Sequence, residues 1–262
     1  MTTRIAGYTI VAELGPANYG TLYTATSDSG AGDELVVKIL DRSASDYEFR
    51  RLSNEIRLYA QLDDPGLAEI VDAGYSDGVL YYAMRRYDGT LADGTFDTAT
   101  TLRIVADAAR GADALHGLGV AHRDIRPATI ARDGHRGRLM DLGLAQVLPG
   151  GDASAYGPRG TPDFVAPEVA MGGAASRASD VWSLGLTLHA VLSTASLRPP
   201  LASTGVLDRL RHVVNHPPVI DPALPGEVRA IIERCVADDP ASRHPTAASL
   251  ADALDSTAEE LT

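Results

Sequence analysis

The sequence is poor in several residue types, and each shortage excludes a class of protein. Its 262 residues include one cysteine, so no disulfide can form within the chain. That residue, Cys235, lies in the helical pattern VRAIIERCV, which favours a small buried side chain over a reactive nucleophile. The seven histidines are scattered without the spacing of metal ligands, so the pattern indicates no zinc site.

Positive charge is also in short supply. The 23 Lys and Arg residues face 35 Asp and Glu residues, and the net charge of -12 argues against nucleic acid or an anionic membrane as a partner. The most apolar run, residues 181–192, is too short to span a bilayer, and the first residues lack a signal-peptide pattern. We therefore expect a cytoplasmic protein with no membrane segment in this chain; its oligomeric state stays open.

Lysine is the rarest basic residue, because the other 22 basic positions are all arginine. The one lysine, Lys38, lies within the apolar stretch LVVKIL of residues 35–40, which is typical of a strand. A buried ammonium needs an anionic partner, although a long side chain can also extend to water. The use of a compact charge at this one position favours a functional role for Lys38.

A helix is predicted over residues 48–62, and Glu55 lies on its apolar face. Leu52, Tyr59 and Leu62 stand at -3, +4 and +7 from Glu55, which is helical spacing. A pair between Glu55 and Lys38 would neutralise two buried charges at once. The alternative is that Glu55 lies at the edge of the apolar stripe.

The first part of the chain is otherwise predicted to be strands. Residues 8–14 and 21–26 alternate as strands do, and they flank the turn LGPANYG, which contains Gly15 and Gly20. Glycines let a backbone approach a ligand closely, but two of them are also typical of an ordinary turn. Residues 67–75 and 79–87 are two further predicted strands.

From residue 98 onward the pattern is mostly helical and leads to two acids on two loops. A predicted helix over residues 98–118 is followed by His122-Arg123-Asp124 and then by Met140-Asp141-Leu142-Gly143. Transfer of a phosphoryl group from ATP needs one carboxylate to orient the acceptor hydroxyl and another to hold magnesium. This pair of loops can supply both.

These motifs resemble those of the eukaryotic-like, bacterial-type serine/threonine protein kinases. The family signatures H-R-D-L-x-x-x-N and D-F-G correspond to HRDIRPAT and DLG, the β3 motif V-A-I-K to VVKI, and the activation-segment end to GTPDFVAPE. The resemblance covers about residues 8–254. It implies an α+β, bilobal fold with a small β-rich N-lobe over residues 1–87, carrying one main helix, and a larger helical C-lobe over residues 88–262.

The resemblance also implies roles for individual residues. The N-lobe would bind nucleotide, and the C-lobe would hold the catalytic loop, the activation segment and substrate-binding helices. The catalytic residues would be Asp124, Arg126, Lys38 and Glu55. The nucleotide would be held by Gly15, Ala17, Gly20, Leu22, Lys38, Met84 and Arg86.

The remaining implied roles concern metal and regulation. Asp141 and Thr129 would bind the metal, and Asp180 would brace the catalytic loop. The activation-segment residues would be Arg123, Ser154, Thr161, Glu168 and Arg243. ATP and Mg²⁺ or Mn²⁺ would be the cofactors, and a protein substrate or signalling partner would be the macromolecular partner.

Three positions depart from the family pattern: Ala17 replaces a glycine, Arg126 replaces a lysine and Thr129 replaces an asparagine. Thr offers one hydroxyl where Asn offers a carbonyl oxygen and an amide, so the resemblance implies a weak, manganese-favoured protein kinase. A nucleotide-binding pseudokinase that acts as a signalling scaffold is the alternative. A small-molecule phosphotransferase fits less well, because GTPDFVAPE belongs to the protein-substrate machinery. Whether the chain is an enzyme stays open at the level of sequence.

Overall fold

The computed structural model describes residues 4–5, 7–28, 34–76, 78–148, 161–203 and 205–261. These residues form two compact units. The first contains the described residues up to Tyr87 together with Asp141–Gly143, and the second contains Asp88–Met140 and the described residues from Leu144 onward. The first unit is built on a β-sheet and the second mainly on helices, as the predicted α+β class requires.

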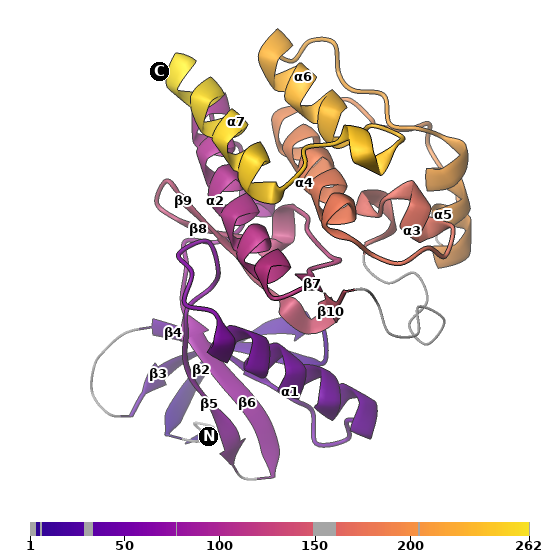
Figure 1. Cartoon of the computed structure of the whole chain (residues 1–262). Coiled ribbons are helices and arrows are strands. Elements are labelled where there is room, and N and C mark those ends of the chain that lie inside the picture. Colours follow the sequence, from indigo (N-terminus) through magenta and orange to yellow (C-terminus); the bar gives the residue numbers. More distant parts are fainter. Residues whose placement is uncertain are drawn as a thin grey trace. The chain divides into compact units, whose positions relative to one another are not determined.

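The first unit is a six-stranded antiparallel sheet with the strand order β1-β2-β3-β4-β6-β5. Figure 1 shows this sheet with helix α1 alongside it. Its strands are β1 (Arg4–Ile5), β2 (Tyr8–Ala17), β3 (Gly20–Ser27), β4 (Glu34–Ile39), β5 (Ile70–Ser76) and β6 (Val79–Arg85).

Helix α1 (Asp46–Gln61) begins at a capping box. The Ser45 hydroxyl accepts a hydrogen bond from the Glu48 backbone N–H, and the Glu48 carboxylate accepts one from the Ser45 backbone N–H at 2.7 Å. These two bonds satisfy donors that a helix start otherwise leaves free. The cap therefore fixes where the helix begins, and with it the position of Glu55 on the buried face.

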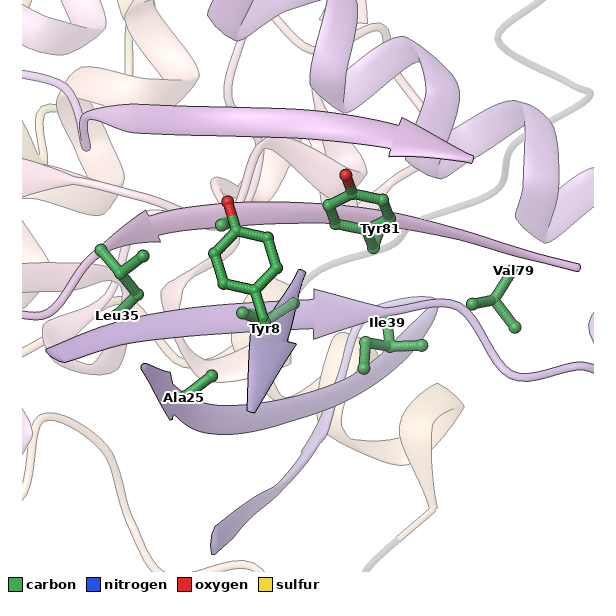
Figure 2. Packing of buried hydrophobic residues seen from close by; sticks show 8 residues of the cluster. Tyr8, Ala25, Leu35, Ile39, Val79 and Tyr81 are labelled. Atoms are coloured by element: carbon green, nitrogen blue, oxygen red, sulfur yellow. The ribbon is translucent and has the colours of Figure 1, made fainter. Parts of the chain in front are cut away.

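The two faces of the sheet carry separate apolar clusters because neighbouring side chains on a strand point in opposite directions. Leu35, Val37 and Ile39 of β4 belong to one cluster with Tyr8 and Tyr81. Figure 2 shows this cluster on one face of the sheet. Val36 and Leu40 belong to a second cluster, which includes Leu52 of α1 and Met84. Lys38 lies two residues from Val36 and from Leu40, so its side chain is on the same face of the sheet as theirs.

The tyrosine hydroxyls of the first cluster have a shared acceptor. Tyr8 and Tyr81 each donate to the Asp72 carboxylate, at 2.9 and 3.0 Å, and their rings pack edge to face. Burial and the neighbouring carboxylate raise the pKa of Tyr8 above its ordinary range. Both hydroxyls therefore stay protonated and hold β5 to the rest of the sheet.

The first hairpin differs from its prediction. The expected turn of residues 14–20 contains only Asn18 and Tyr19, because β2 continues through Gly15 and Ala17 and pairs with β3 up to Gly20. The β2–β3 register shifts at Ile10/Ala12 and at Glu13/Gly15, as in β-bulges, and the two strands continue to pair beyond Gly15. The glycine and proline of this segment therefore indicated a turn where the chain forms a bulged strand.

The second unit is organised around helices α2 (Thr98–Gly117), α4 (Arg177–Leu192) and α7 (Ala247–Glu260). Helices α2 and α7 lie side by side, as Figure 1 shows. Ser176 caps the start of α4, and the helix is buried on nearly all sides from Ser179 to His189. This confirms the prediction of a buried helix over residues 179–192.

Short elements complete the second unit and connect its helices. Its remaining helices are α3 (Pro167–Ala170), α5 (Val206–Asn215) and α6 (Gly226–Cys235). Its strands are β7 (Val120–Ala121), β8 (Ile130–Asp133), β9 (Arg136–Leu139) and β10 (Gln146–Val147), paired as β7 with β10 and β8 with β9. Its single-turn helices include η1 (Leu91–Asp93), η2 (Pro127–Thr129), η5 (Pro162–Phe164) and η6 (Pro240–Ser242). A further one, η3 (Leu142–Leu144), begins in the first unit and ends in the second.

Within the part of the chain that the structure describes, no helix is both long and apolar enough to cross a membrane.

Candidate functional site

Lys38 and Glu55 form a buried ion pair in the first unit. The Lys38 Nζ lies 2.9 Å from the Glu55 Oε2, and the two side chains are 1% and 0% exposed. Strand β4 places the lysine on the face that α1 covers, and Glu55 is on the buried side of that helix. Tyr82, which is opposite Lys38 in the sheet register, donates a further hydrogen bond to the Glu55 Oε1 at 3.0 Å. The pair expected from the sequence is therefore present.

A third charge lies beside this pair. The Lys38 Nζ is 3.4 Å from the Asp141 Oδ1, so the ammonium faces two carboxylates. Burial alone would lower the pKa of Lys38, but Glu55 and Asp141 together raise it above its ordinary value. Lys38 is therefore an ammonium that faces two carboxyl groups. Burial raises the pKa of Glu55 above its ordinary value, although the Lys38 ammonium acts in the opposite direction.

Asp141 is held by three residues of the first unit. Its Oδ2 accepts a hydrogen bond from the Asn18 Nδ2 at 3.0 Å, its Oδ1 faces Lys38, and its backbone N–H donates to the Tyr59 hydroxyl at 3.0 Å. Its φ of +66° is in the left-handed region, which costs a non-glycine residue energy. Strain at a residue with this many fixing contacts is typical of a functional position.

The glycine positions of the hairpin have structural explanations. Gly15 has φ of +124° and Gly20 has φ of +149°, and a Cβ on Gly20 would collide with the Ile39 carbonyl oxygen of the neighbouring strand. Ala17 pairs with Gly20 across the hairpin. The backbone conformation alone therefore requires both glycines, whatever the hairpin binds.

The other residues expected to hold nucleotide lie in the same sheet or directly after it. Leu22 of β3 and Met84 of β6 belong to the apolar cluster on the α1 side of the sheet. Arg86 follows β6, and its Nη1 lies 2.6 Å from the exposed Glu34 carboxylate. The structure thus gives Arg86 a surface partner of its own.

Asp124 belongs to the second unit, and its carboxylate has two neighbours there. Its Oδ1 accepts hydrogen bonds from the Thr161 backbone N–H at 2.9 Å and from the Thr161 hydroxyl at 3.1 Å. Its Oδ2 lies 3.5 Å from the Arg126 Nε, a contact that compensates part of its charge. Asp124 is buried, so these contacts fix the orientation of the carboxylate.

Thr129 holds the backbone of the loop that carries Asp124. Its hydroxyl accepts a hydrogen bond from the Arg126 N–H at 3.1 Å and lies 2.8 Å from the Asp124 carbonyl oxygen, to which it donates. The side chain is 1% exposed. Because a hydroxyl has one proton and two lone pairs, these bonds use most of its capacity. Its contacts favour a loop-holding role over the metal-binding role expected from the sequence.

Asp180 braces the same loop from helix α4. Its carboxylate accepts hydrogen bonds from the backbone N–H groups of His122 at 2.8 Å and Arg123 at 3.0 Å, and it contacts His116 at 2.8 Å. Burial would raise the pKa of Asp180, but these hydrogen bonds and the histidines lower it below its ordinary value. The carboxylate is therefore ionised, and it supports Arg123 at a left-handed φ of +75°.

His122 links the loop to the strand that precedes Asp141. Its Nδ1 accepts a hydrogen bond from the Asp124 N–H at 3.2 Å, which leaves its Nε2–H to donate to the Met140 carbonyl oxygen at 3.1 Å. The backbone of Asp124 and that of Met140 are thereby fixed to one imidazole ring.

Glu168 and Arg243 form a bidentate ion pair, with distances of 2.8 and 3.0 Å. The Arg243 guanidinium also donates to the carbonyl oxygens of Ala178 and Ala237 and lies 4.9 Å from the centre of the Trp182 ring. Arg243 is fully buried, as expected for this pair, whereas Glu168 remains partly exposed. Ser154, expected to be a phosphorylation site, lies outside the described residues.

The donor set around Asp141 suits a hard divalent cation. Each carboxylate oxygen has one N–H donor beside it, so lone pairs remain on both, and carboxylate oxygen is the ligand that Mg²⁺ and Mn²⁺ prefer. Lys38 adds a positive charge suited to an anionic phosphate. The residues of the first unit are therefore compatible with a metal and a nucleotide phosphate.

Sequence reasoning missed three side chains near this set: Asn18, Tyr59 and Tyr82. Tyr59 carried a signal, because it lies one helical turn after Glu55 on the same apolar face. Tyr82 is opposite Lys38 only through the β4–β6 register, which a single sequence does not reveal. Asn18 appeared as an ordinary turn residue and carried no signal.

Comparison with known proteins gives concordant matches. The model of the family described as "Protein kinase domain" matches residues 8–254. Serine/threonine-protein kinase PknK of Mycobacterium bovis is 30% identical over an alignment 260 residues long, which covers 95% of this chain and 23% of that protein. PknA of Mycobacterium tuberculosis is 30% identical over an alignment 243 residues long, which covers 87% of this chain and 56% of PknA. PknJ of the same species is 30% identical over an alignment 263 residues long, which covers 95% of this chain and 45% of PknJ. The chain therefore spans less than two thirds of each of these relatives.

Proposed function

Because this chain belongs to the protein kinase domain family, we propose that it is a serine/threonine protein kinase. In the proposed reaction the hydroxyl oxygen of a protein Ser or Thr attacks the γ-phosphorus of ATP. The bond from that phosphorus to the β,γ-bridging oxygen breaks, ADP leaves, and the hydroxyl proton passes to a carboxylate. The names of the similar proteins PknK and PknA support Ser and Thr as acceptors.

The observation that carries the proposal is the buried Lys38–Glu55 pair with Asp141 beside it. An unpaired buried charge costs several kcal/mol, and Lys38 and Glu55 already satisfy each other as an ion pair. Asp141, whose side chain is 19% exposed, is not needed for that pairing. Asp141 places a further carboxyl group beside the ammonium, and such a pair can hold a metal and a phosphate together. The first unit, which combines residues of the predicted N-lobe with Asp141–Gly143 of the predicted C-lobe, would accordingly bind the nucleotide.

In this proposal the first unit orients the phosphates. Lys38 neutralises phosphate oxygens, and Glu55 keeps the ammonium in place with the help of Tyr82. Asp141 holds a divalent cation, which when bound offsets the charge of the phosphate oxygens during transfer. Gly15, Ala17 and Gly20 present backbone N–H groups, while Leu22, Met84 and the residues through Arg86 hold the base.

The second unit supplies the acid–base group and the substrate-binding helices. Asp124 orients the acceptor hydroxyl and accepts its proton through Oδ2, since Thr161 occupies Oδ1 with two hydrogen bonds. Arg126 offsets negative charge beside that oxygen. The Glu168–Arg243 pair anchors the end of the activation segment, and Arg123 would bind a phosphate on that segment, with Ser154 as the candidate acceptor.

Magnesium is the proposed metal. Manganese is the proposed substitute, because we expect it to bind better where one of the family's metal ligands is weakened. The contacts of Thr129 support this, because its hydroxyl already holds the Asp124 loop. That hydroxyl has little capacity left for a cation, and we expect a slow kinase that works better with Mn²⁺.

The test is transfer of the radiolabelled γ-phosphate to a generic protein acceptor, with Mg²⁺ and then Mn²⁺, followed by identification of the phosphorylated amino acid. Asp141→Asn should remove the signal, because an amide holds a cation less well than a carboxylate. Asp252→Asn is the matched control, since Asp252 is a highly exposed acid on α7 and should leave transfer unchanged.

A pseudokinase is the competing outcome. If the protein binds ATP tightly but transfers no phosphate with either metal, the kinase proposal is wrong and a nucleotide-binding scaffold replaces it. Label found on tyrosine alone would contradict the proposed substrate class.

A further inference from the structure

The tip of the first hairpin contacts the residue proposed to hold the metal. Asn18 is at this tip, and its carboxamide Nδ2 donates to the Asp141 Oδ2 at 3.0 Å. A Cβ added to Gly143, two residues after Asp141, would lie 3.2 Å from the Asn18 Cβ. The same Cβ would lie 3.4 Å from the Glu55 Oε2, so the Asp-Leu-Gly segment packs closely against the Asn18 and Glu55 side chains.

Tyr19, the next residue, fixes the tip to helix α1. It has a left-handed φ of +59°, its ring packs edge to face on Tyr47 at 5.9 Å, and the Arg51 guanidinium lies 5.9 Å from the ring centre. These contacts hold the turn in place, so the carboxamide of Asn18 is directed at Asp141 by the surrounding packing.

A carboxamide beside a carboxylate can serve a cation with little rearrangement. In the structure the NH₂ group of Asn18 faces the negative Asp141. A divalent cation on Asp141 reverses the charge that Asn18 meets, and rotation of the amide by about 180° presents its carbonyl oxygen. Amide carbonyl oxygens, with carboxylates, bind hard cations.

The loop of the second unit lacks this chemical group. Thr129 stands where the family has Asn, and its hydroxyl is bonded to the backbone of Asp124 and Arg126. The chain therefore keeps the loop-holding contribution of that position but has no carboxamide there.

We propose that Asn18 supplies a carboxamide oxygen for the cation held by Asp141, and so takes over part of the metal-binding contribution that an Asn at position 129 would make. This inference rests on the proposed function, because it needs the first unit to bind a metal with a nucleotide. Asn18 is then part of the metal site as well as of the hairpin.

The test is the linkage between metal and nucleotide, measured by calorimetric titration of ATP with EDTA and again with Mn²⁺. For the wild type, the ratio of the two dissociation constants gives the tightening caused by the metal. Asn18→Ala should reduce this ratio about tenfold, the size of effect typical for a residue that supports a metal site. Its affinity for ATP in EDTA should stay within about twofold of the wild-type value, because no charge has changed.

Three further variants test the carboxamide itself and provide a control. Asn18→Gln keeps a carboxamide and should recover part of the ratio, while Asn18→Asp should increase the ratio and weaken ATP binding in EDTA by repulsion. Asn54→Ala removes an exposed carboxamide on α1, which contacts Arg57, and should match the wild type. Melting curves of all variants check that the first unit remains folded.

Two results would overturn the inference. One is an unchanged ratio in Asn18→Ala. The other is tighter ATP binding by Asn18→Ala both with and without metal, which would make the Asn18–Asp141 contact a latch that opposes binding. If the wild type transfers phosphate while either result holds, only this inference fails. If the wild type binds no ATP under either condition, the proposed function fails with it.

Discussion

At the scale of single residues, replacement of Lys38 should change both the stability of the protein and the rate of phosphoryl transfer, for two different physical reasons. Lys38→Met leaves Glu55 buried without its ammonium, which typically costs about 3 to 5 kcal/mol of stability, while Tyr82 still donates to the carboxylate. Phosphoryl transfer should fall at least about 100-fold, as for loss of one preorganised charge. Urea unfolding and the radiolabel assay measure the two effects.

The double variant Lys38→Met/Glu55→Gln separates stability from chemistry. Removing both charges should restore most of the stability lost in Lys38→Met without restoring transfer. A double variant that transfers phosphate at the wild-type rate would show that the ammonium has no catalytic role.

Thr129 gives the second prediction at this scale. Thr129→Asn should raise phosphoryl transfer with Mg²⁺ about tenfold, roughly 1.4 kcal/mol of transition-state stabilisation, because it returns a carboxamide to the loop. Thr129→Val is the matched control. It keeps the shape but removes the hydroxyl bonds to Asp124 and Arg126, and should lower both rate and stability. Equal rates for the wild type and Thr129→Asn would show that the missing carboxamide at position 129 does not limit phosphoryl transfer.

At the scale of elements, the Glu168–Arg243 pair joins helix α3 to the segment before α7. Arg243→Ala should lower the free energy of unfolding by about 3 to 5 kcal/mol, because it leaves the Glu168 carboxylate and two carbonyl oxygens without their donor. Arg229→Ala removes an exposed pair with Glu233 and should cost less than about 1 kcal/mol. Chemical denaturation of both variants measures the difference, and similar losses would refute the structural role of Arg243.

The elements that the sequence predicts well are those with strong periodicity. Helix α4 is predicted over residues 179–192 and runs from Arg177 to Leu192. The prediction is close because the helix is apolar on nearly all sides, which is typical of a buried helix. The first hairpin was predicted less well. Gly15 and Pro16 usually break strands, but here they lie in a bulged strand held by pairing with β3.

Residues of the candidate site divide in the same way. Lys38, Asp124 and Asp141 are in motifs and Glu55 lies on the apolar face of a periodic helix, so the sequence alone predicts them as site residues. The contacts of Asn18 and Tyr82 depend on sheet register and on the exact turn, which arise from tertiary packing. The hydrogen bonds of the Thr129 hydroxyl also could not be predicted, because its partners are backbone groups and every residue type carries these.

At the scale of the whole molecule, one buried histidine should make stability depend on acidity. Burial and the charge of Arg234 lower the pKa of His244 to about 4. The unfolded chain therefore binds a proton near the ordinary histidine pKa before the folded chain does. The stability linked to His244 is complete above about pH 6.5 and is lost as the pH falls toward 4.

His244→Gln should reduce this acid sensitivity. Between pH 7 and 4.5 we expect the variant to lose about 2 kcal/mol less of its unfolding free energy than the wild type, a figure that allows for partial solvent screening. His135→Gln, a change at an exposed histidine, is the control and should follow the wild type. Parallel urea titrations at the two pH values measure both, and identical curves for His244→Gln and the wild type would exclude this histidine as the source.

The single lysine has a practical consequence for labelling chemistry. Amine-acylating reagents modify lysine side chains, and this chain offers one, which is 1% exposed and kept protonated by its two carboxylates. A free reagent should therefore react slowly with it, whereas a nucleotide carrying an acyl group on its terminal phosphate would deliver that group to the amine. The mass of the proteolytic peptide that contains Lys38 would then report on the occupancy of this one ammonium, with no engineered tag. In a chain otherwise free of lysine, the reporter is already built in.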